Sequence, residues 1–266
     1  MSALDLSVVI ITRNEEADLP ACLESVRGLA SEVVIVDARS TDRTPEVARS
    51  FGARWLTRDF DDYASQKQHA LEQATRAWAL SLDADERVTP GLAEELRQVL
   101  PAAACAGFSI PFETEFLGRV LRHGGPGSER HVRLLRRGAG RFVGGALHEG
   151  LALDGPVGGL AGAIRHVPYR DLDEYLEKLG RYTTLAARKR WEAGRRAHLG
   201  HHLLPFWELF VRLILRLGIL DGRAGVVYAG LAAFHTWIKY VKLAEFASDP
   251  ANRTRIPPTR RNDNDD

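Results

Sequence analysis

The chain has 266 residues, of which 45% are apolar, so it is long enough for one large domain, or for a domain and an appendage, that buries a sizeable core. Its 36 Lys and Arg residues nearly balance its 35 Asp and Glu residues, and the net charge of +1 excludes the strongly basic signature of a general nucleic-acid-binding protein. Cys22 and Cys105 belong to no metal-type cluster, and the N-terminus lacks the basic and apolar regions of a signal peptide. These features favour a cytoplasmic location.

The first hundred residues alternate between predicted strands and predicted helices. Apolar runs rich in β-branched residues predict buried strands over 6–12, 33–36, 53–56 and 78–82. Helical periodicity, together with Pro and Gly at the ends, predicts helices over 19–26, 45–52, 63–76 and 90–99. Strand and helix alternate four times, which implies an α/β fold with a mainly parallel sheet and right-handed crossovers.

Carboxylates stand where two of these strands end. Asp37 ends the second strand, and Asp83-Ala84-Asp85 ends the fourth. Because side chains alternate along a strand, we expect Asp83 and Asp85 to point the same way. Ligands of open α/β sheets bind at the carboxyl ends of the strands, and neighbouring carboxylates need a cation or a donor. The pattern favours Mg²⁺ or Mn²⁺ with a phosphate ligand, and a plain helix-capping turn is the alternative.

The second half of the chain changes character. Strands are expected near 107–112 and 131–137, a glycine-rich loop over 120–127, and a helix from Asp171. After His201, apolar and aromatic runs punctuated by cations predict amphipathic helices that lie on a membrane surface, with packing on the catalytic domain or a dimer contact as the alternative. The longest charge-free run, 224–238, is shorter than the ~20 residues that a spanning helix needs. The tail, 249–266, is expected to be disordered.

A series of short segments, in order along the chain, resembles family 2 glycosyltransferases with the GT-A fold. The segments of the first half are 7–15, 36–42, 66–67 and 82–86. Later segments resemble the bacterial lipopolysaccharide-core β-1,4-glucosyltransferase branch, and these are 123–125, 133–137, 141–142, 148–149, 175–178 and 217–222. The resemblance extends over about residues 6–246. One departure is Arg39, which stands where the family usually has a glycine at a turn.

The resemblance implies an inverting transfer of a sugar, glucose from UDP-glucose, to a lipopolysaccharide-core or lipid-linked acceptor at the cytoplasmic face of the inner membrane. It implies nucleotide-sugar contacts from Thr12, Arg13, Asn14, Glu15, Asp37, Arg39, Lys67, Asp83, Ala84 and Asp85. It places Mg²⁺ or Mn²⁺ on Asp85, with help from Asp83 and His148. The general base is Glu149, with Glu129 as the second choice, and Arg133 and Arg136 bind phosphate groups of acceptor or donor.

The resemblance also implies a domain division. We expect a catalytic domain over 1–200, with a nucleotide-sugar half over about 1–105 and an acceptor half over 106–200. Peripheral membrane helices follow over 201–248.

Three alternatives remain open at this point. Within the transferases, a polyprenyl-phosphate-linked acceptor competes with a lipopolysaccharide core. A nucleotidyltransferase is expected to have a Gly-rich, Lys-containing loop after the first strand, but 12–16 contains no glycine. A non-catalytic nucleotide-sugar-binding module is expected to have lost a carboxylate, whereas Asp83 and Asp85 are both present.

Overall fold

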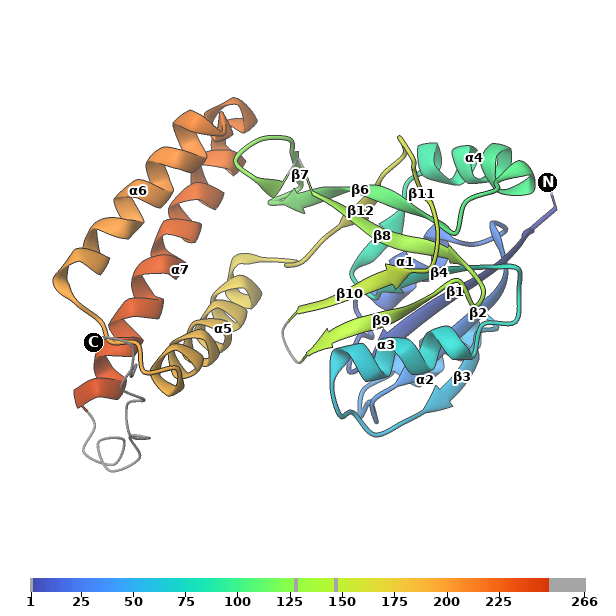
Figure 1. Ribbon diagram of the computed structural model, residues 1–266, viewed down its shortest axis with the longest axis horizontal. Helices are drawn as coiled ribbons and strands as arrows, with labels where there is room; N and C mark the ends of the chain where they lie inside the picture. Colours follow the sequence, from blue (N-terminus) through green and yellow to red (C-terminus); the bar gives the residue numbers. More distant parts are fainter. Residues whose placement is uncertain (1, 127–128, 146–147, 249–266) are drawn as a thin grey trace, which may run out of the picture. The chain divides into compact units, whose positions relative to one another are not determined.

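The computed structural model describes residues 2–126, 129–145 and 148–248, without the side chains of His148 and Glu149 (Figure 1). The predicted tail over 249–266 therefore lies outside the described residues. The chain forms two compact units, the first comprising Met1–Glu115 and Ser128–Pro168, the second Phe116–Gly127 and Tyr169–Asp266. The long helix that begins at Leu172 belongs to the second unit, where it packs against the C-terminal helix.

The first unit is a mixed sheet with helices on both faces. Its strands are β1 (Leu4–Thr12), β2 (Ala30–Asp37), β3 (Arg54–Thr57), β4 (Trp78–Asp83), β5 (Glu86–Val88), β6 (Gly107–Phe116), β8 (Arg130–Arg136), β9 (Gly140–Gly145), β10 (His148–Leu153), β11 (Val157–Gly159) and β12 (Ile164–His166). Its helices are α1 (Leu19–Ser25), α2 (Thr44–Ser50), α3 (Tyr63–Glu72), α4 (Pro90–Val99) and the 3₁₀ turn η1 (Leu100–Ala102). The main sheet has the strand order β3-β2-β1-β4-β8-β6-β12-β5, with β11 beside β6.

The four strands predicted in the first hundred residues pair in parallel, as β3-β2-β1-β4 (Figure 1). This confirms the predicted α/β class. Strand alternation divides the core into two layers, because Leu6, Val8 and Ile10 pack with α1 and α4 while Val9 packs with α3 on the other face. Beyond β4 the sheet continues with the antiparallel pair β4 and β8, so the parallel order ends there.

Strands β9 and β10 form a separate antiparallel hairpin that packs against α3 (Figure 1). Phe142, Leu151 and Leu153 of the hairpin join the apolar layer on that face of the sheet. Gln68 of α3 accepts a hydrogen bond from the backbone N–H of Phe142 at 2.9 Å. The hairpin thereby covers part of α3 and brings the backbone of Glu149, which pairs with Gly144, to this side of the unit.

The second unit is helical. It contains β7 (Arg119–Leu121), α5 (Leu172–Glu192), the 3₁₀ turn η3 (Leu199–Leu203), α6 (Leu204–Phe210), the π turn η4 (Val211–Leu215), the 3₁₀ turn η5 (Gly218–Asp221) and α7 (Gly222–Ser248). Helix α7 packs with both α5 and α6 (Figure 1). Its residues Ala224, Ala229, Ala233 and Leu243 are buried, so deleting the residues after His201 would remove part of this unit's core.

Asp221 joins two motifs of the second unit that lie about a hundred residues apart in the sequence. Its carboxylate accepts backbone hydrogen bonds from Arg122 and His123, and it lies 2.9 Å from Nδ1 of His123. Burial alone would raise the pKa of Asp221, but these hydrogen bonds hold it below its usual value. The 123–125 and 217–222 segments are therefore parts of one folded corner of the second unit.

Candidate active site at the carboxyl ends of β1, β2 and β4

The carboxyl ends of three neighbouring strands meet at one edge of the first unit. In the register of the sheet, Thr12 pairs with Asp37 and Ile11 pairs with Asp83. The Thr12 hydroxyl donates a hydrogen bond to Asp37 Oδ1 at 2.9 Å, and both groups are buried. The structure thus brings Asp37 and Asp83 to the same edge, as the strand order predicts.

The loops after β1 and β2 are hydrogen-bonded to each other. Asp37 accepts hydrogen bonds from the backbone N–H of Ser40 at 2.7 Å and from the Ser40 hydroxyl at 2.5 Å. The Asn14 side chain accepts from the backbone N–H of Thr41 at 2.8 Å. Both Asn14 and Arg39 have positive φ values, 58° and 57°, which non-glycine residues seldom adopt outside functional turns.

The remaining predicted residues of these loops lie on the same surface. Arg39 forms an ion pair with Asp59, so the residue that departs from the family pattern has a partner within the chain. Arg13 is exposed, and the backbone N–H of Glu15 donates to the Thr44 hydroxyl at 2.8 Å. The two loops therefore form one continuous polar surface beside buried Asp37.

Asp83 lies in a buried cluster with two cations. Lys67 Nζ lies 2.9 Å from Asp83 Oδ1 and 3.0 Å from Oδ2, and Arg133 donates to Oδ2 at 3.0 Å. Arg133 also donates to Glu86 at 2.5 Å, and Glu86 accepts from the backbone N–H of Asp83. Burial alone would raise the pKa of Asp83, but the charges of Lys67 and Arg133 hold it well below the usual range. Burial raises the pKa of Glu86 to about 7.

Asp85 has a different partner. Strand β4 ends at Asp83, and Ala84-Asp85 form a turn, so the expectation that Asp83 and Asp85 point the same way along one strand does not hold. Ala84 is buried, whereas Asp85 Oδ2 lies 3.2 Å from Nε2 of His166 on β12. Burial alone would lower the pKa of His166, but the Asp85 carboxylate raises it above the usual value.

Aromatic packing surrounds this pair. The Phe112 ring lies edge-on to the His166 ring, with the ring centres 6.3 Å apart, and the Arg133 guanidinium lies 5.4 Å from the Phe112 ring centre. His131 also packs edge-on against Phe112, and its Nε2 lies 3.7 Å from a carboxylate oxygen of Glu129. Glu129 is therefore linked to the Asp83 cluster by a series of contacts: Glu129 lies beside His131, His131 packs on Phe112, and Phe112 packs on His166 and Arg133.

Arg136 lies elsewhere. It pairs in the sheet with Trp78, at the opposite end of β4 from Asp83. Its side chain donates to the backbone carbonyls of Ala103 and Cys105, and its guanidinium lies 4.7 Å from the Trp78 ring centre. The structure therefore gives Arg136 a packing role and does not bring it to the phosphate site predicted for it.

His166, Glu86 and Phe112 belong to the cluster but were not among the predicted site residues. A possible signal for His166 was its place in a short strand-like run, 163–167, ending before Pro168. The side chains of His148 and Glu149 lie outside the described residues, so their predicted roles stay predictions. Among the described residues, no group of three or more His, Cys, Asp or Glu side chains is arranged around a metal-sized site.

Comparison with known proteins gives a consistent family assignment. Residues 7–125 match the model of the family described as "Glycosyl transferase family 2". The chain is 34% identical over 246 residues to the lipopolysaccharide core biosynthesis glycosyltransferase LpsC of Rhizobium meliloti (strain 1021), covering 86% of this chain and 91% of that protein. It is also 35% identical over 94 residues to an uncharacterized glycosyltransferase of Rickettsia typhi, which it matches over 32% of that protein's length.

Among solved structures, the chain is similar to residues 1–349 of S. aureus TarS in complex with UDP. The TM-score is 0.46 and the sequence identity 13%, over 92% of this chain and 91% of the other. The likeness of the two folds is partial at this TM-score. The family match and the similarity to LpsC over nearly its whole length show that the chain belongs to glycosyltransferase family 2.

Proposed function

We propose that this glycosyltransferase transfers glucose from UDP-glucose, with inversion, to a lipopolysaccharide-core or related envelope glycan. The observation that carries the proposal is the convergence of Asp37, Asp83, Asp85 and His166 at one sheet edge. The name of the R. meliloti relative supports the choice of acceptor. The loops after β1 and β2 supply buried Asp37 and the exposed polar residues Arg13 and Asn14, whose hydrogen-bonding groups suit the base and ribose of a nucleotide.

The donor set of the site fits a divalent cation. Asp85 and His166 offer one carboxylate oxygen and one imidazole nitrogen, which are ligands for Mn²⁺ and, for the carboxylate, Mg²⁺. The Nε2 atom of His166 lies 3.2 Å from Asp85, so an ion would bind there by displacing the proton that the two side chains share. Asp83 is a poor ligand, because Lys67 and Arg133 already neutralise it, so we assign the ion to Asp85 and His166. When bound, the ion supplies charge neutralisation for the leaving diphosphate.

The buried cations have an indirect part in this proposal. Lys67, which the resemblance places among the nucleotide-sugar contacts, holds Asp83 in place together with Arg133. The neutralised Asp83 fixes the end of β4 and with it the turn that presents Asp85. Asp83 retains an exposed fraction of 30% in its side chain, which suits a hydrogen bond to a ribose hydroxyl.

The acceptor hydroxyl needs a general base, for which Glu149 is the first candidate and Glu129 the second. Glu149→Gln is expected to leave donor binding unchanged and to lower the transfer rate by roughly 10²–10⁴-fold, because the amide cannot take the proton. Glu129→Gln is the matched comparison, with a change of less than about tenfold. Single-turnover transfer and UDP binding are measured on both variants. A normal rate for Glu149→Gln with a large loss for Glu129→Gln would reverse the assignment.

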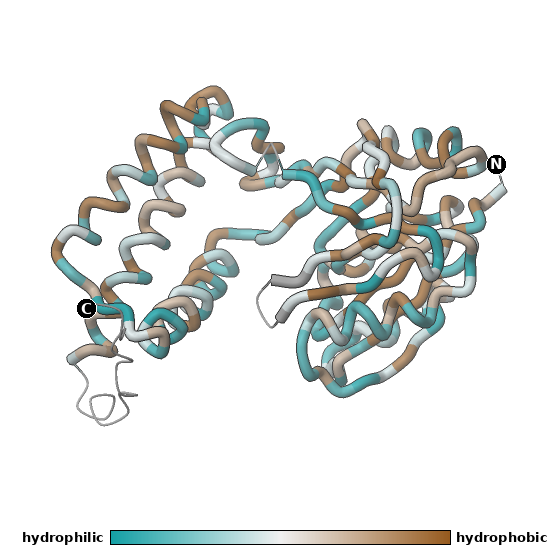
Figure 2. The backbone as a smooth tube through the Cα atoms, viewed as in Figure 1, coloured by the Kyte–Doolittle hydropathy of each residue, from teal (hydrophilic) through white to brown (hydrophobic). Residues whose placement is uncertain are grey.

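Association with the inner-membrane surface is part of the proposal. The stretch from η3 to η5 exposes a row of large apolar side chains, and the apolar segments along α6 and beyond are visible in Figure 2. They are Leu199, Leu203, Phe206, Trp207, Phe210, Ile214, Leu215, Leu217, Ile219 and Leu220. Arg216 in this stretch and Arg223 at the start of α7 are exposed, whereas the two carboxylates of the stretch, Glu208 and Asp221, have cationic or hydrogen-bonding partners. This combination suits an interfacial surface on anionic lipid.

The described helices set a limit on the form of this association. Within residues 2–126, 129–145 and 148–248, none of the helices combines the length and the apolar content required to cross a bilayer.

Substituting the exposed aromatic pair tests the membrane proposal without removing the core of the second unit. Phe206→Ser with Trp207→Ser is expected to weaken binding to vesicles that contain anionic phospholipid by at least roughly tenfold, because each ring loses its burial in the interface. Phe60→Ser, on an exposed ring of the first unit, is the control and is expected to leave binding unchanged. Vesicle flotation measures both. Equal binding of the aromatic double variant and the wild type would contradict the proposal.

The donor is tested with a panel of UDP-, GDP- and ADP-linked hexoses, each with Mg²⁺, with Mn²⁺ or with EDTA. The expected result is metal-dependent release of UDP from UDP-glucose. Release in EDTA at the same rate would contradict the assigned ion, and release from another donor would change the sugar or nucleotide but not the reaction class.

A polyprenyl-phosphate-linked acceptor competes with the lipopolysaccharide core, and purified acceptors of both kinds distinguish them. Donor binding without any release would favour the non-catalytic module.

A further inference from the structure

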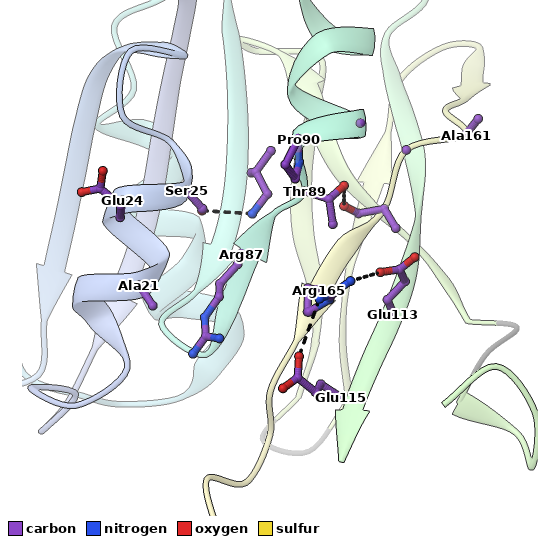
Figure 3. A pocket seen from close by; sticks show the side chains of 14 residues that line it. Ala21, Glu24, Ser25, Arg87, Thr89, Pro90, Glu113, Glu115, Ala161 and Arg165 are labelled. Atoms are coloured by element: carbon purple, nitrogen blue, oxygen red, sulfur yellow. Dashed lines mark hydrogen bonds and ion pairs between the residues drawn. The ribbon is translucent and has the colours of Figure 1, made fainter. Parts of the chain in front are cut away.

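A cavity of about 660 Å³ lies in the first unit beside the short strands β5 and β12 (Figure 3). Its wall is formed by α1, β5, the start of α4, the end of β6, β12 and the loop before β12. Its charged lining consists of Glu24, Arg87, Glu113, Glu115 and Arg165. The volume is within the range of small-molecule sites.

The cavity and the candidate active site lie on opposite faces of the same two strands. In the register of β5 and β12, Glu86 is opposite His166, and Arg87 is opposite Arg165. Because side chains alternate along a strand, Glu86 and His166 face the active site while Arg87 and Arg165 face the cavity. The cavity is therefore separate from the proposed donor site.

The cavity lining carries three carboxylates and two guanidinium groups, and Arg87 is the one of these five charges without a close partner among the described residues. Two like charges directly opposite each other on neighbouring strands destabilise the pair. Arg165 is compensated, since it lies 2.8 Å from a Glu113 oxygen and 3.7 Å from a Glu115 oxygen (Figure 3). Arg87 forms no ion pair or side-chain hydrogen bond with the residues that the structure describes, and Glu24 is paired with Arg27 at 2.9 Å.

The part of Arg87 that a ligand could reach is the end of its guanidinium. Its Nε atom is buried without a hydrogen-bond partner, as are those of Arg97 and Arg165 in the described part of the chain, so an anion would be bound by the terminal nitrogens. The fork of a guanidinium suits phosphate and carboxylate groups.

The rim of the cavity is preformed. Glu95 accepts backbone hydrogen bonds from Ala161 at 2.9 Å and from Gly162 at 2.6 Å, which holds the loop before β12 against α4. A Cβ atom at Gly162 would lie 2.4 Å from Leu92 Cα, so the close approach of loop and helix requires glycine. The Thr89 hydroxyl donates to the Ala163 carbonyl at 2.7 Å (Figure 3). A ligand would thus enter a site whose shape is already set.

We infer that this cavity is a second, non-catalytic binding site for a carbohydrate that carries an anionic substituent, either a phosphate or a carboxylate. The Arg87 guanidinium binds the anion, in a charge-assisted and bidentate way. Glu113 and Glu115 accept hydrogen bonds from sugar hydroxyls, and Pro90 packs against the C–H face of the ring. The inference does not depend on the donor or acceptor proposed above.

The test measures binding of simple probes to the full chain by isothermal titration calorimetry, with UDP at saturation to occupy the donor site. The probes are glucose 6-phosphate, glucuronate, glucose and inorganic phosphate. We expect glucose 6-phosphate or glucuronate to bind more tightly than glucose and inorganic phosphate, and the tighter of the two identifies the anion. Arg87→Met is expected to weaken that binding by roughly tenfold, the loss of one charge-assisted contact. Arg76→Met, on an exposed arginine outside the cavity, is the control.

A second variant guards against misfolding of Arg87→Met. Glu115→Gln is expected to weaken binding of the anionic sugar while binding of inorganic phosphate is unchanged. Three outcomes overturn the inference: equal binding to wild type and Arg87→Met, loss of binding when UDP is present, or inorganic phosphate binding as tightly as the anionic sugars. Release of UDP from UDP-glucose is measured on the same samples. If no anionic sugar binds while UDP is still released, the cavity proposal fails and the proposed function stands. If an anionic sugar binds but no UDP is released, the proposed function fails and the cavity proposal stands.

Discussion

Asp85→Ala is expected to lower metal-dependent turnover of the sugar nucleotide by roughly 10²–10³-fold, or about 2.7–4 kcal/mol of transition-state stabilisation. The reason is that Asp85 offers the carboxylate oxygen, 3.2 Å from His166, to which we assign the ion that neutralises the leaving diphosphate. Turnover is measured as the initial rate of UDP release with Mg²⁺ or Mn²⁺ at saturation.

The fold is expected to survive this substitution, because Asp85 lies in a turn and its side chain is 27% exposed. The far-ultraviolet circular dichroism and the thermal midpoint are measured alongside. Asp173→Ala, on an exposed aspartate of α5, is the matched control and is expected to keep full activity. Full activity of Asp85→Ala would remove Asp85 from the mechanism.

Lys67→Met is expected to lower the free energy of unfolding by about 3–5 kcal/mol, the range for breaking a buried ion pair. The pair is fully buried only on the side of Lys67, since the Asp83 side chain is 30% exposed. Lys67 has an exposed fraction of 4% in its side chain and lies 2.9 Å from Asp83. Arg133 still contacts Asp83 at 3.0 Å, which puts the expected loss at the lower end of that range. Urea denaturation, with fluorescence as the readout, measures the change.

The same substitution in an ordinary helix pair provides the control. Lys178 of α5 lies 2.9 Å from Glu174 at an i,i+4 spacing, and its side chain is 28% exposed. Lys178→Met is expected to cost less than about 0.5 kcal/mol. The double variant Lys67→Met with Asp83→Asn is expected to recover roughly half of the loss, because it no longer buries an uncompensated charge. Equal losses for Lys67→Met and Lys178→Met would show that Asp83 does not need its buried cation.

The parallel part of the fold was predictable because its signals are local. β1, β2 and β4 each contain an apolar run, and helices α1 and α2 start beside a proline and are followed by a glycine. The meeting of Asp37 and Asp83 at one edge then follows from the direction of parallel strands. Boundaries were less predictable, and helix α3 ends at Glu72, four residues before the predicted end.

The rest of the site depends on long-range pairing that periodicity does not report. His166 meets Asp85 across 81 residues because β12 pairs with β5, and both strands are three residues long. Lys67 was expected to contact the nucleotide sugar, whereas its side chain is 4% exposed and lies 2.9 Å from Asp83. Glu86 is buried for a similar reason, as the partner of Arg133 from β8.

In the second unit, too, the sequence pattern did not predict which elements pack together. Composition predicted amphipathic helices over 201–248; the part up to Leu220 exposes its large apolar side chains, whereas α7 packs into a core with α5. Amphipathic patterns do not distinguish a helix that packs on a neighbour from one that lies on lipid. The contact of His123 with Asp221 likewise joins segments that the sequence shows only as separate motifs.

The central claim is that the edge formed by Asp37, Asp83, Asp85 and His166 transfers glucose from UDP-glucose to an envelope glycan. Incubation of the protein with UDP-glucose, Mn²⁺ and a lipopolysaccharide-core oligosaccharide, followed by mass spectrometry of the acceptor, tests it most directly. The predicted result is a mass gain of one hexose that disappears in Asp85→Ala and in EDTA. An unmodified acceptor with the wild-type protein, or the same mass gain with Asp85→Ala, would contradict the account.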